Sequence, residues 1–205
     1  MAFENAPELI RPDPPLVSGS VPIEYYDEYL QPLDVPERLR VVEIPLADEK
    51  AYLRLVGRTA LTDPGTLDHQ PFNLKIPESN IQSGGALTLG CPNDAGEYVG
   101  AVTVNRQPAD GKFWINTLVV ADVAKGQGVA SRLMTRVLEY VGRQTNVDQV
   151  KLKVYLGNIP ARKLYALGAF EVCEDSTNPA QPLVLCLKGR ENIRLAAQTY
   201  REHAQ

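Results

Sequence analysis

The stretch FWINTLVVADVAKGQGVA, residues 113–130, decides the fold of this chain. It predicts an apolar strand over 113–120, a short turn, and a glycine-rich loop that opens directly into a helix. Gly126 and Gly128 allow the backbone to turn tightly and to approach a ligand closely. Because the loop amides and the N-terminal end of the helix then lie at the end of a strand, the stretch predicts an anion site that suits a diphosphate.

Two other kinds of diphosphate-binding loop fit the stretch less well. The chain has no Gly-x-x-x-x-Gly-Lys-Ser/Thr run, which a P-loop requires. A dinucleotide-binding loop reads Gly-x-Gly-x-x-Gly, and here Ser131 replaces the third glycine. Asp148, the acidic residue nearest to the expected distance, precedes a strand instead of ending one. Taken alone, the loop is equally consistent with a plain strand-to-helix turn.

A second informative stretch is NIPARKLYALGAF, residues 158–170. It predicts a helix over Ile159–Leu167, with Asn158 as its N-cap and Gly168 as its stop. The patterning elsewhere predicts alternating strands and helices, and therefore a mixed α/β domain. We expect further strands at 38–44, 86–91, 98–105, 149–155, 169–173 and 182–187, further helices at 47–58, 128–141 and 190–203, and a long loop at 59–85.

Together, the two stretches resemble the GNAT N-acetyltransferase superfamily. The loop KGQGVA is similar to the family's pyrophosphate loop, Gln/Arg-x-x-Gly-x-Gly/Ala, with Lys125 where arginine or glutamine is usual. Lysine still supplies hydrogen-bond donors, but not the planar fork of arginine. The second stretch is similar to the pattern Asn-x-x-Ala-x-x-Leu-Tyr-x-x-x-Gly-Phe of the helix that closes over coenzyme A, with Ala169 as an extra residue between Gly168 and Phe170.

The resemblance implies a mixed, mostly antiparallel sheet that is splayed at the acetyl-CoA site and carries helices on both faces. The strands at 113–120 and 149–155 would separate, and the pantetheine arm of acetyl-CoA would lie between them. The residues that the resemblance assigns to the cofactor are Leu118, Val119, Val120, Lys125, Gly126, Gln127, Gly128, Val129, Ala130, Ser131 and Asn158. No metal is implied.

The resemblance also implies the chemistry, in which an amine attacks the thioester carbonyl and a thiolate leaves. Tyr165 is at the position of the family's usual general acid, and a phenol with a pKa near 10 can protonate a thiolate whose conjugate acid has a pKa near 8.5. Asn116 stands where many relatives carry a glutamate base, and asparagine cannot accept a proton. A water chain, Glu97, Glu171 or His69 is then the candidate base, unless the amine arrives neutral.

The chain divides into a proline-rich acidic extension at 1–37, the domain at 38–188 and a helical extension at 189–205. The first segment holds 7 of the 16 prolines. Its acidic and tyrosine-rich part, 22–37, would either attract a cationic amine or form a solvated arm. The final helix would pack on its own domain or across a homodimer. We expect a small-molecule amine as the acceptor, by analogy with the fold alone.

Composition restricts the class of protein. A net charge of -4 and a pI near 5.3 argue against a nucleic-acid partner. Three scattered cysteines without metal-ligand spacing suggest reduced thiols in a cytoplasmic protein. We expect no signal peptide, because the first residues have no apolar core, and no membrane-spanning segment, because no apolar run is long enough to span a bilayer. The leading hypothesis is an N-acetyltransferase; the alternatives are a non-catalytic acyl-CoA sensor and an acyltransferase that uses a longer acyl-CoA, an oxygen or a peptide acceptor.

Overall fold

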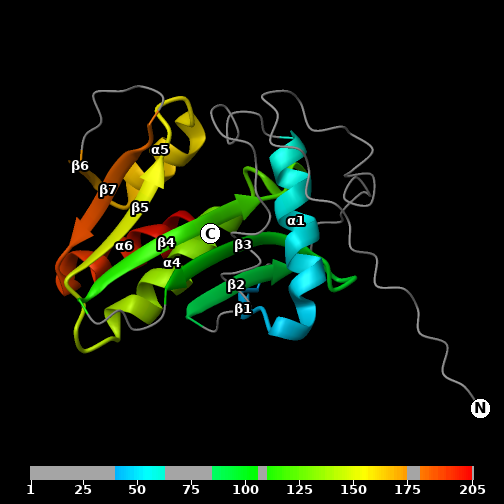
Figure 1. The fold of residues 1–205 in the computed structure, drawn as a ribbon, viewed down its shortest axis with the longest axis horizontal. Helices are drawn as coiled ribbons and strands as arrows, with labels where there is room; N and C mark the ends of the chain where they lie inside the picture. The colour runs from blue at the N-terminus through cyan, green and yellow to red at the C-terminus, as the bar shows by residue number, and fades with distance from the viewer. Residues whose placement is uncertain (1–39, 63–84, 106–109, 175–180, 205) are drawn as a thin grey trace, which may run out of the picture.

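The computed structural model describes residues 40–62, 85–105, 110–174 and 181–204. These residues form a seven-stranded sheet with helices on both faces (Figure 1). The strands are β1 (Val42–Glu43), β2 (Ala86–Pro92), β3 (Tyr98–Asn105), β4 (Lys112–Val120), β5 (Gln149–Val154), β6 (Glu171–Glu174) and β7 (Leu183–Lys188). The helices are α1 (Glu49–Thr62), α4 (Val129–Gly142), α5 (Ile159–Leu167) and α6 (Arg190–His203), with 3-10 turns at η2 (Leu46–Asp48) and η3 (Asp122–Ala124).

The sheet is antiparallel except between β4 and β5. Its strand order is β1-β2-β3-β4-β5-β7-β6. Strands β4 and β5 pair in parallel only over their first residues, ending at Ile115 opposite Leu152. Beyond this point β4 runs on to Val120 beside β3, and β5 runs on to Val154 beside β7. The two strands therefore separate, which confirms the expected mostly antiparallel, splayed α/β sheet.

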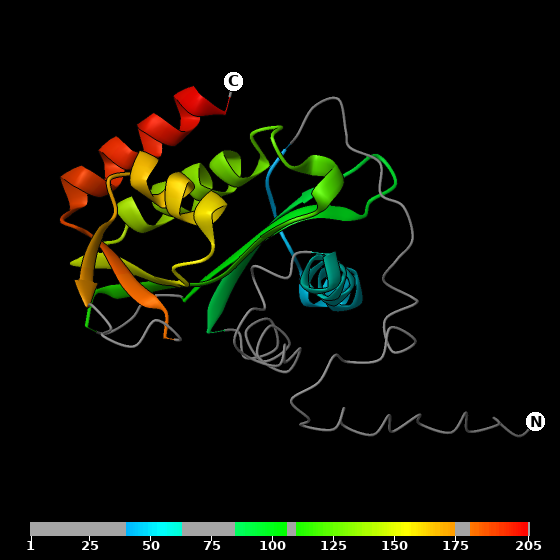
Figure 2. The ribbon, with the colours of Figure 1, turned by 90° about the horizontal axis from the view of Figure 1, so that it is seen from above.

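The helices form layers on the two faces of the sheet. Helix α1 lies on one face, and α4, α5 and α6 lie on the other (Figure 2). Helix α4 buries an apolar stripe whose members recur at helical spacing. These buried residues are Leu133, Met134, Val137, Leu138 and Val141. On the opposite face, the hydroxyl groups of Tyr52 in α1 and Thr103 in β3 form a hydrogen bond of 3.2 Å. The buried side chains of α1 and α4 belong to one hydrophobic core, which includes both faces of the sheet.

The C-terminal helix packs on its own domain. Helix α6 lies along α4, and its predicted apolar face is buried. The residues of this face are Ile193, Ala196, Ala197 and Tyr200. At one end of the pair, the side chain of Ile193 approaches Gly142; at the other end, the backbone of Ala204 approaches Gly128. The apolar stripe of α6 therefore has a partner within this chain.

Some predicted boundaries differ from the structure. The first strand is expected at 38–44, and of its described residues, 40–44, only Val42–Glu43 form a strand, which pairs with β2. The first helix begins at Glu49, after the turn η2, and continues to Thr62, so the start of the expected loop at 59–85 is helical. The segment 1–37 and His69 lie outside the described residues. No helix among the described residues is both long and apolar enough to cross a membrane.

The expectation of three reduced thiols is wrong for two of them. Cys173 and Cys186 form a disulfide, with their Cα atoms 5.8 Å apart. The two residues lie on the neighbouring strands β6 and β7, a proximity that follows from strand pairing and not from spacing in the sequence. Cys91 is free and buried, and burial raises the pKa of its thiol to about 12. Cysteine usage thus no longer supports a cytoplasmic location.

Candidate active site

Strand β4 is irregular at the point where it leaves β5. On its other side, Thr117 lies opposite Thr103 and Ile115 lies opposite Val104, so Asn116 is an extra residue in the ladder with β3. Such an insertion is a β-bulge, which redirects the side chains around it. Asn116 is exposed and directly follows the last β4–β5 pair. The structure therefore brings Asn116 to the start of the gap between the two strands.

The remainder of β4 presents backbone groups to this gap. Leu118, Val119 and Val120 pair with β3 along one side of the strand. The parallel pairing with β5 has ended before these residues, so their other side faces the gap. An extended ligand can add to a strand in this position through main-chain hydrogen bonds.

The glycine-rich loop follows β4 and the turn η3. Both Gly126 and Gly128 have positive φ values, of 77° and 73°, a conformation that favours glycine. Gly128 is the N-cap of α4 and provides no side-chain hydrogen bond. The first helical bond runs from the Arg132 N–H to the Gly128 carbonyl at 2.9 Å. The N–H groups of the preceding helical residues, 129–131, therefore have no acceptor within the helix, which is the arrangement expected of an anion site.

Two side chains of the loop contact groups in the preceding turn. The Lys125 Nζ atom lies 2.6 Å from a carboxylate oxygen of Asp122, and both side chains are about half exposed. The Gln127 side-chain amide donates to the Val123 carbonyl at 2.9 Å. Because the Lys125–Asp122 ion pair is exposed, it contributes little to stability and the ammonium group can be shared with an anion at small cost.

Helix α5 begins as the sequence predicts. The Asn158 side-chain oxygen accepts a hydrogen bond from the Ala161 N–H at 3.1 Å, which confirms Asn158 as the N-cap. Helix α5 lies on the same face of the sheet as α4, and it follows β5 just as α4 follows β4 (Figure 2). The two helices that carry the sequence motifs therefore begin beyond the two strands that separate.

Tyr165 lies on α5 and is buried, with 6% of its surface exposed. Its ring packs against that of Phe170, with the ring centroids 5.9 Å apart. Its hydroxyl has no hydrogen-bond partner among the residues that the structure describes. Burial raises the pKa of this phenol, because the charged form would lose its hydration. Tyr165 is therefore a neutral hydrogen donor at physiological pH.

The end of α5 departs from the family pattern in a different way from that expected. Ala169 has a φ of 56° and occupies the place of the pattern's glycine, so Phe170 stands at its usual distance from Tyr165. Gly168, which directly precedes Ala169, must be a glycine because of its packing and not because of its backbone conformation. A Cβ atom at Gly168 would lie only 2.4 Å from the Tyr200 hydroxyl oxygen. The stretch therefore contains no extra residue.

The candidate bases are distributed over several elements. Glu97 lies in the turn between β2 and β3, where its N–H donates to the Asn93 side chain. Glu171 lies on β6, the outer strand, and is separated from the gap by β5 and β7. His69 lies outside the described residues. Of the two candidate bases that the structure describes, Glu97 and Glu171, Glu171 therefore lies on a strand remote from the gap.

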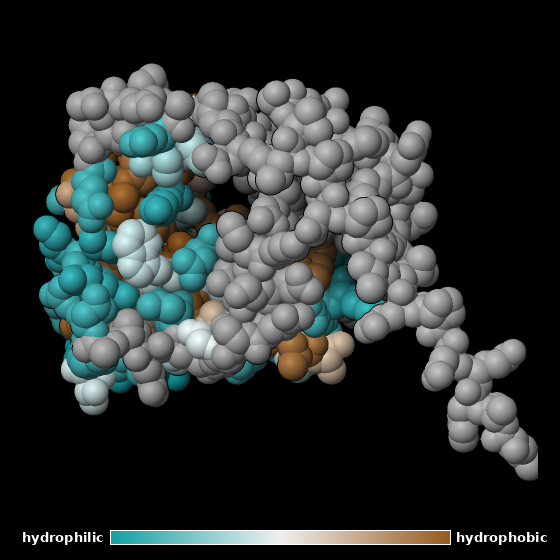
Figure 3. Space-filling view, in the orientation of Figure 1, coloured by the Kyte–Doolittle hydropathy of each residue, from teal (hydrophilic) through white to brown (hydrophobic). Residues whose placement is uncertain are grey.

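A cationic and aromatic group that the sequence analysis did not single out lies near the gap. The Nζ atoms of Lys151 and Lys153 on β5 are 5.4 Å and 5.9 Å from the ring centroid of Trp114 on β4. Lys151 also contacts Glu174 at 2.7 Å. Hydrophilic side chains are frequent on the face of the sheet seen in Figure 3. In the sequence, Lys151 and Lys153 alternate with apolar residues along the predicted strand, and this pattern could have indicated the group.

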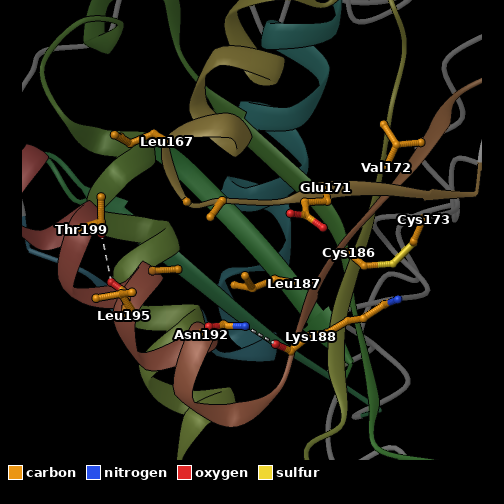
Figure 4. Close-up of a pocket in the computed structure, with 13 residues that line it drawn as sticks. Leu167, Glu171, Val172, Cys173, Cys186, Leu187, Lys188, Asn192, Leu195 and Thr199 are labelled. Carbon is orange, nitrogen blue, oxygen red and sulfur yellow. Dashed lines mark hydrogen bonds between the residues drawn. A yellow bond between two sulfur atoms is a disulfide. The ribbon is translucent and has the colours of Figure 1, made fainter.

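A cavity of about 320 Å³ lies elsewhere, between α6, the β6–β7 pair and the end of α5 (Figure 4). Leu187 and Leu195 contribute to its apolar lining. Two of its polar side chains are satisfied within or next to α6: Asn192 donates to the Lys188 carbonyl, and Thr199 donates to the Leu195 carbonyl. The cavity is therefore separate from the gap between β4 and β5.

Comparison with known proteins agrees with this arrangement. The solved structures that share the fold include the following three. A GNAT acetyltransferase of Staphylococcus aureus Mu50 has a TM-score of 0.59 and 13% identity, over 73% of this chain and 98% of that one. A putative GNAT acetyltransferase of Desulfovibrio desulfuricans has a TM-score of 0.59 and 16% identity, over 74% and 99%. The PaiA N-acetyltransferase of Thermoplasma acidophilum, in complex with coenzyme A, has a TM-score of 0.58 and 12% identity, over 74% and 99%.

These identities are too low to show more than the fold. No curated protein matches the chain by sequence. The profile described as the acetyltransferase (GNAT) family matches residues 59–169, more than half of the chain. This segment includes the separating strands, the glycine-rich loop and helix α5 with Tyr165. The chain therefore belongs to the GNAT acetyltransferase family and is an acyltransferase.

Proposed function

We propose that the protein is an acetyl-CoA-dependent N-acetyltransferase that acts on a small-molecule amine, with Tyr165 as its general acid. One observation carries the proposal. Beyond the gap between β4 and β5, helix α4 begins with an N-terminus that has no side-chain cap. Helix α5, which follows β5, bears the buried Tyr165, whose hydroxyl has no hydrogen-bond partner among the described residues. The similar T. acidophilum structure contains coenzyme A, which supports a ligand of this class.

The geometry of β4, the glycine-rich loop and α5 supports the proposed cofactor contacts. The backbone of 118–120 would pair with the pantetheine arm, since β4 is not paired with β5 there. The amides of Gln127 to Ser131 would bind the pyrophosphate, with the Gln127 N–H giving up its 3.4 Å hydrogen bond to the Ala124 carbonyl. The half-exposed Lys125 would add a positive charge. The Asn158 side-chain oxygen is already used as a cap, which leaves its amide nitrogen for a contact with coenzyme A.

In the proposed reaction the amine nitrogen bonds to the acetyl carbonyl carbon, and the carbon–sulfur bond then breaks. A backbone N–H of 118–120 would stabilise the negative charge on the carbonyl oxygen. The Tyr165 hydroxyl would donate its proton to the departing thiolate. Asn116 would orient the amine by a hydrogen bond, but an amide side chain accepts no proton. A protonated amine would therefore first lose a proton to water, unless it enters the site neutral. The attacking nitrogen then loses a further proton through water, which yields the amide and restores the Tyr165 hydroxyl.

The first test is calorimetric titration of the protein with acetyl-CoA, with NAD and ATP as controls. We expect saturable binding of acetyl-CoA alone. Comparison with longer acyl-CoA thioesters reads out the acyl length that the gap accepts. A panel of amines that includes a polyamine, an aminoglycoside and a short peptide then identifies an acceptor through release of the coenzyme A thiol. A folded protein that binds no acyl-CoA would contradict the proposal.

The role of Tyr165 is tested by Tyr165→Phe. We expect kcat to fall roughly 100-fold, because general acid catalysis contributes an effect of this size, while the Kd for acetyl-CoA stays unchanged. Tyr140→Phe is the matched control, since Tyr140 is a partly buried tyrosine near the far end of α4. Because burial raises the pKa of Tyr165, the wild-type rate should not decline through loss of its proton as the pH approaches 10.

The second candidate function is an acyl-CoA sensor without turnover. It is favoured by Asn116, which places a side chain that cannot act as a base at the start of the gap. A sensor predicts tight acyl-CoA binding and no thiol release with any amine of the panel. Turnover that depends on Tyr165 would exclude it.

A further inference from the structure

Helix α6 lies beyond the segment that matches the family, and it contacts both helices that carry the family's motifs. We infer that Tyr200 of α6 is a positioning residue for Tyr165, because it fixes the last turn of α5 and thereby the direction of the Tyr165 hydroxyl. The inference rests on the proposed function, in which Tyr165 is the general acid. It assigns a positioning role to the C-terminal helix α6.

The hydrogen bonds at the end of α5 provide the first support. The Gly168 N–H donates to the Tyr165 carbonyl at 3.1 Å, instead of to the Leu164 carbonyl one turn back. The Phe170 N–H donates to the same Tyr165 carbonyl at 3.1 Å. The Leu164 carbonyl instead accepts the Tyr200 hydroxyl at 2.8 Å. Tyr200 thus satisfies a carbonyl near the end of the helix, at the residue directly before Tyr165.

The packing around Gly168 provides the second support. Tyr200 is fully buried. A Cβ atom at Gly168 would lie 2.4 Å to 2.6 Å from the hydroxyl oxygen and ring carbons of Tyr200. Only glycine permits this approach, so the contact sets the separation between α6 and the turn that follows Tyr165. The last turn of α5 is therefore restrained by Tyr200 at two places, through the hydrogen bond to the Leu164 carbonyl and through close packing against Gly168.

The third support is that α6 is itself held on α4. The backbone of Ala204 lies 3.3 Å from the place of a Cβ atom on Gly128, the N-cap of α4. The Arg201 guanidinium contacts the Glu139 carboxylate of α4. Helix α6 therefore links the turn that carries Tyr165 to the helix that begins at the glycine-rich loop. Tyr200 is the side chain through which this link reaches α5.

The test compares Tyr200→Phe, Tyr165→Phe and the double variant in the full chain, with acetyl-CoA and the fastest amine of the panel. Thr199→Ala is the matched control, because it removes a neighbouring hydroxyl that bonds only within α6 (Figure 4). We expect Tyr200→Phe to lower kcat about tenfold while the KM for acetyl-CoA stays within about twofold. In the Tyr165→Phe background, the same change should have no further effect on kcat, since Tyr200 acts through Tyr165.

Hydrogen exchange supplies a readout that needs no acceptor. In Tyr200→Phe the amides of Gly168 and Phe170 should exchange about tenfold faster, and in Thr199→Ala they should not change. Unchanged exchange at these amides would overturn the inference, as would a Tyr200→Phe loss of kcat that multiplies with that of Tyr165→Phe. If Tyr165→Phe is slow but Tyr200→Phe is fully active, the inference about Tyr200 is overturned and the acid role of Tyr165 stands. A fully active Tyr165→Phe would instead overturn the acid role on which the inference rests.

Discussion

Gly168 and Ala169 meet two different demands at adjacent positions. Ala169 adopts a positive φ, which strains an alanine but not a glycine. Gly168 has an ordinary φ of -85°, and its lack of a side chain serves the contact with Tyr200. Position 169 therefore favours glycine because of its backbone conformation, and position 168 requires glycine because of packing. The chain has a glycine only at position 168.

We expect Ala169→Gly to stabilise the protein by about 0.5–1 kcal/mol, because relief of the strained φ exceeds the added entropy of the unfolded chain. Gly168→Ala should destabilise it by about 2 kcal/mol or more, because the new methyl group would overlap Tyr200. Urea unfolding of both variants measures the two free energies. A destabilised Ala169→Gly or a neutral Gly168→Ala would contradict this account.

Among the elements, those with local signals were predicted well. Helix α5 has the predicted bounds, Ile159–Leu167, because the residues that flank it directly, Asn158 as N-cap and Gly168 as C-cap, signal where it begins and ends. The first strand was predicted too long, because its length depends on pairing with β2 and not on its own composition. The disulfide was missed because it depends on the register of β6 and β7, which the cysteine spacing does not reveal.

The disulfide should stabilise the protein without affecting the cofactor site. It closes a loop with a sequence separation of 13 at the outer strand, so we expect its reduction to lower the free energy of unfolding by about 2–3 kcal/mol. The Kd for acetyl-CoA should not change, because β7 and β5 lie between β6 and the gap. Thermal unfolding with and without a reductant measures the first effect, and calorimetry measures the second.

The double variant Cys173→Ser/Cys186→Ser is the control for this experiment. Its melting temperature should be insensitive to the reductant, since the remaining Cys91 is free and buried. A reductant effect of the same size in the double variant would show that the disulfide is not its source.

For the whole molecule, the family match ends at residue 169, but the buried core continues into α6. Ile193 and Tyr200 are fully buried there, and burial of two large side chains contributes about 3–6 kcal/mol, a large part of the stability of a small domain. We expect a chain that ends at Gly189 to lose cooperative unfolding and to aggregate. Calorimetry and size-exclusion chromatography measure this, and a stable, monomeric truncated chain would contradict it.

The candidate site could be predicted in part from the sequence. The glycine-rich loop, Asn158 and Tyr165 could be singled out as candidates because each motif is contiguous. The bulge at Asn116 was not, since it exists only as a mismatch between β4 and β3. The contact between Tyr200 and the Leu164 carbonyl joins residues 36 apart in the sequence, and nothing in either segment indicates the other.

The separation of β4 and β5 has a further consequence for the free protein. A sheet usually exposes unpaired main-chain groups only at its two outer strands, which charge or proline can protect from association with other chains. Among the residues that the structure describes, the sheet also has an unpaired edge in its interior, between Ile115 and Val120. Such protection is not available at this edge if the same groups must bind a ligand. The bound ligand would then also serve as the cover that keeps this sheet from recruiting a strand of another molecule.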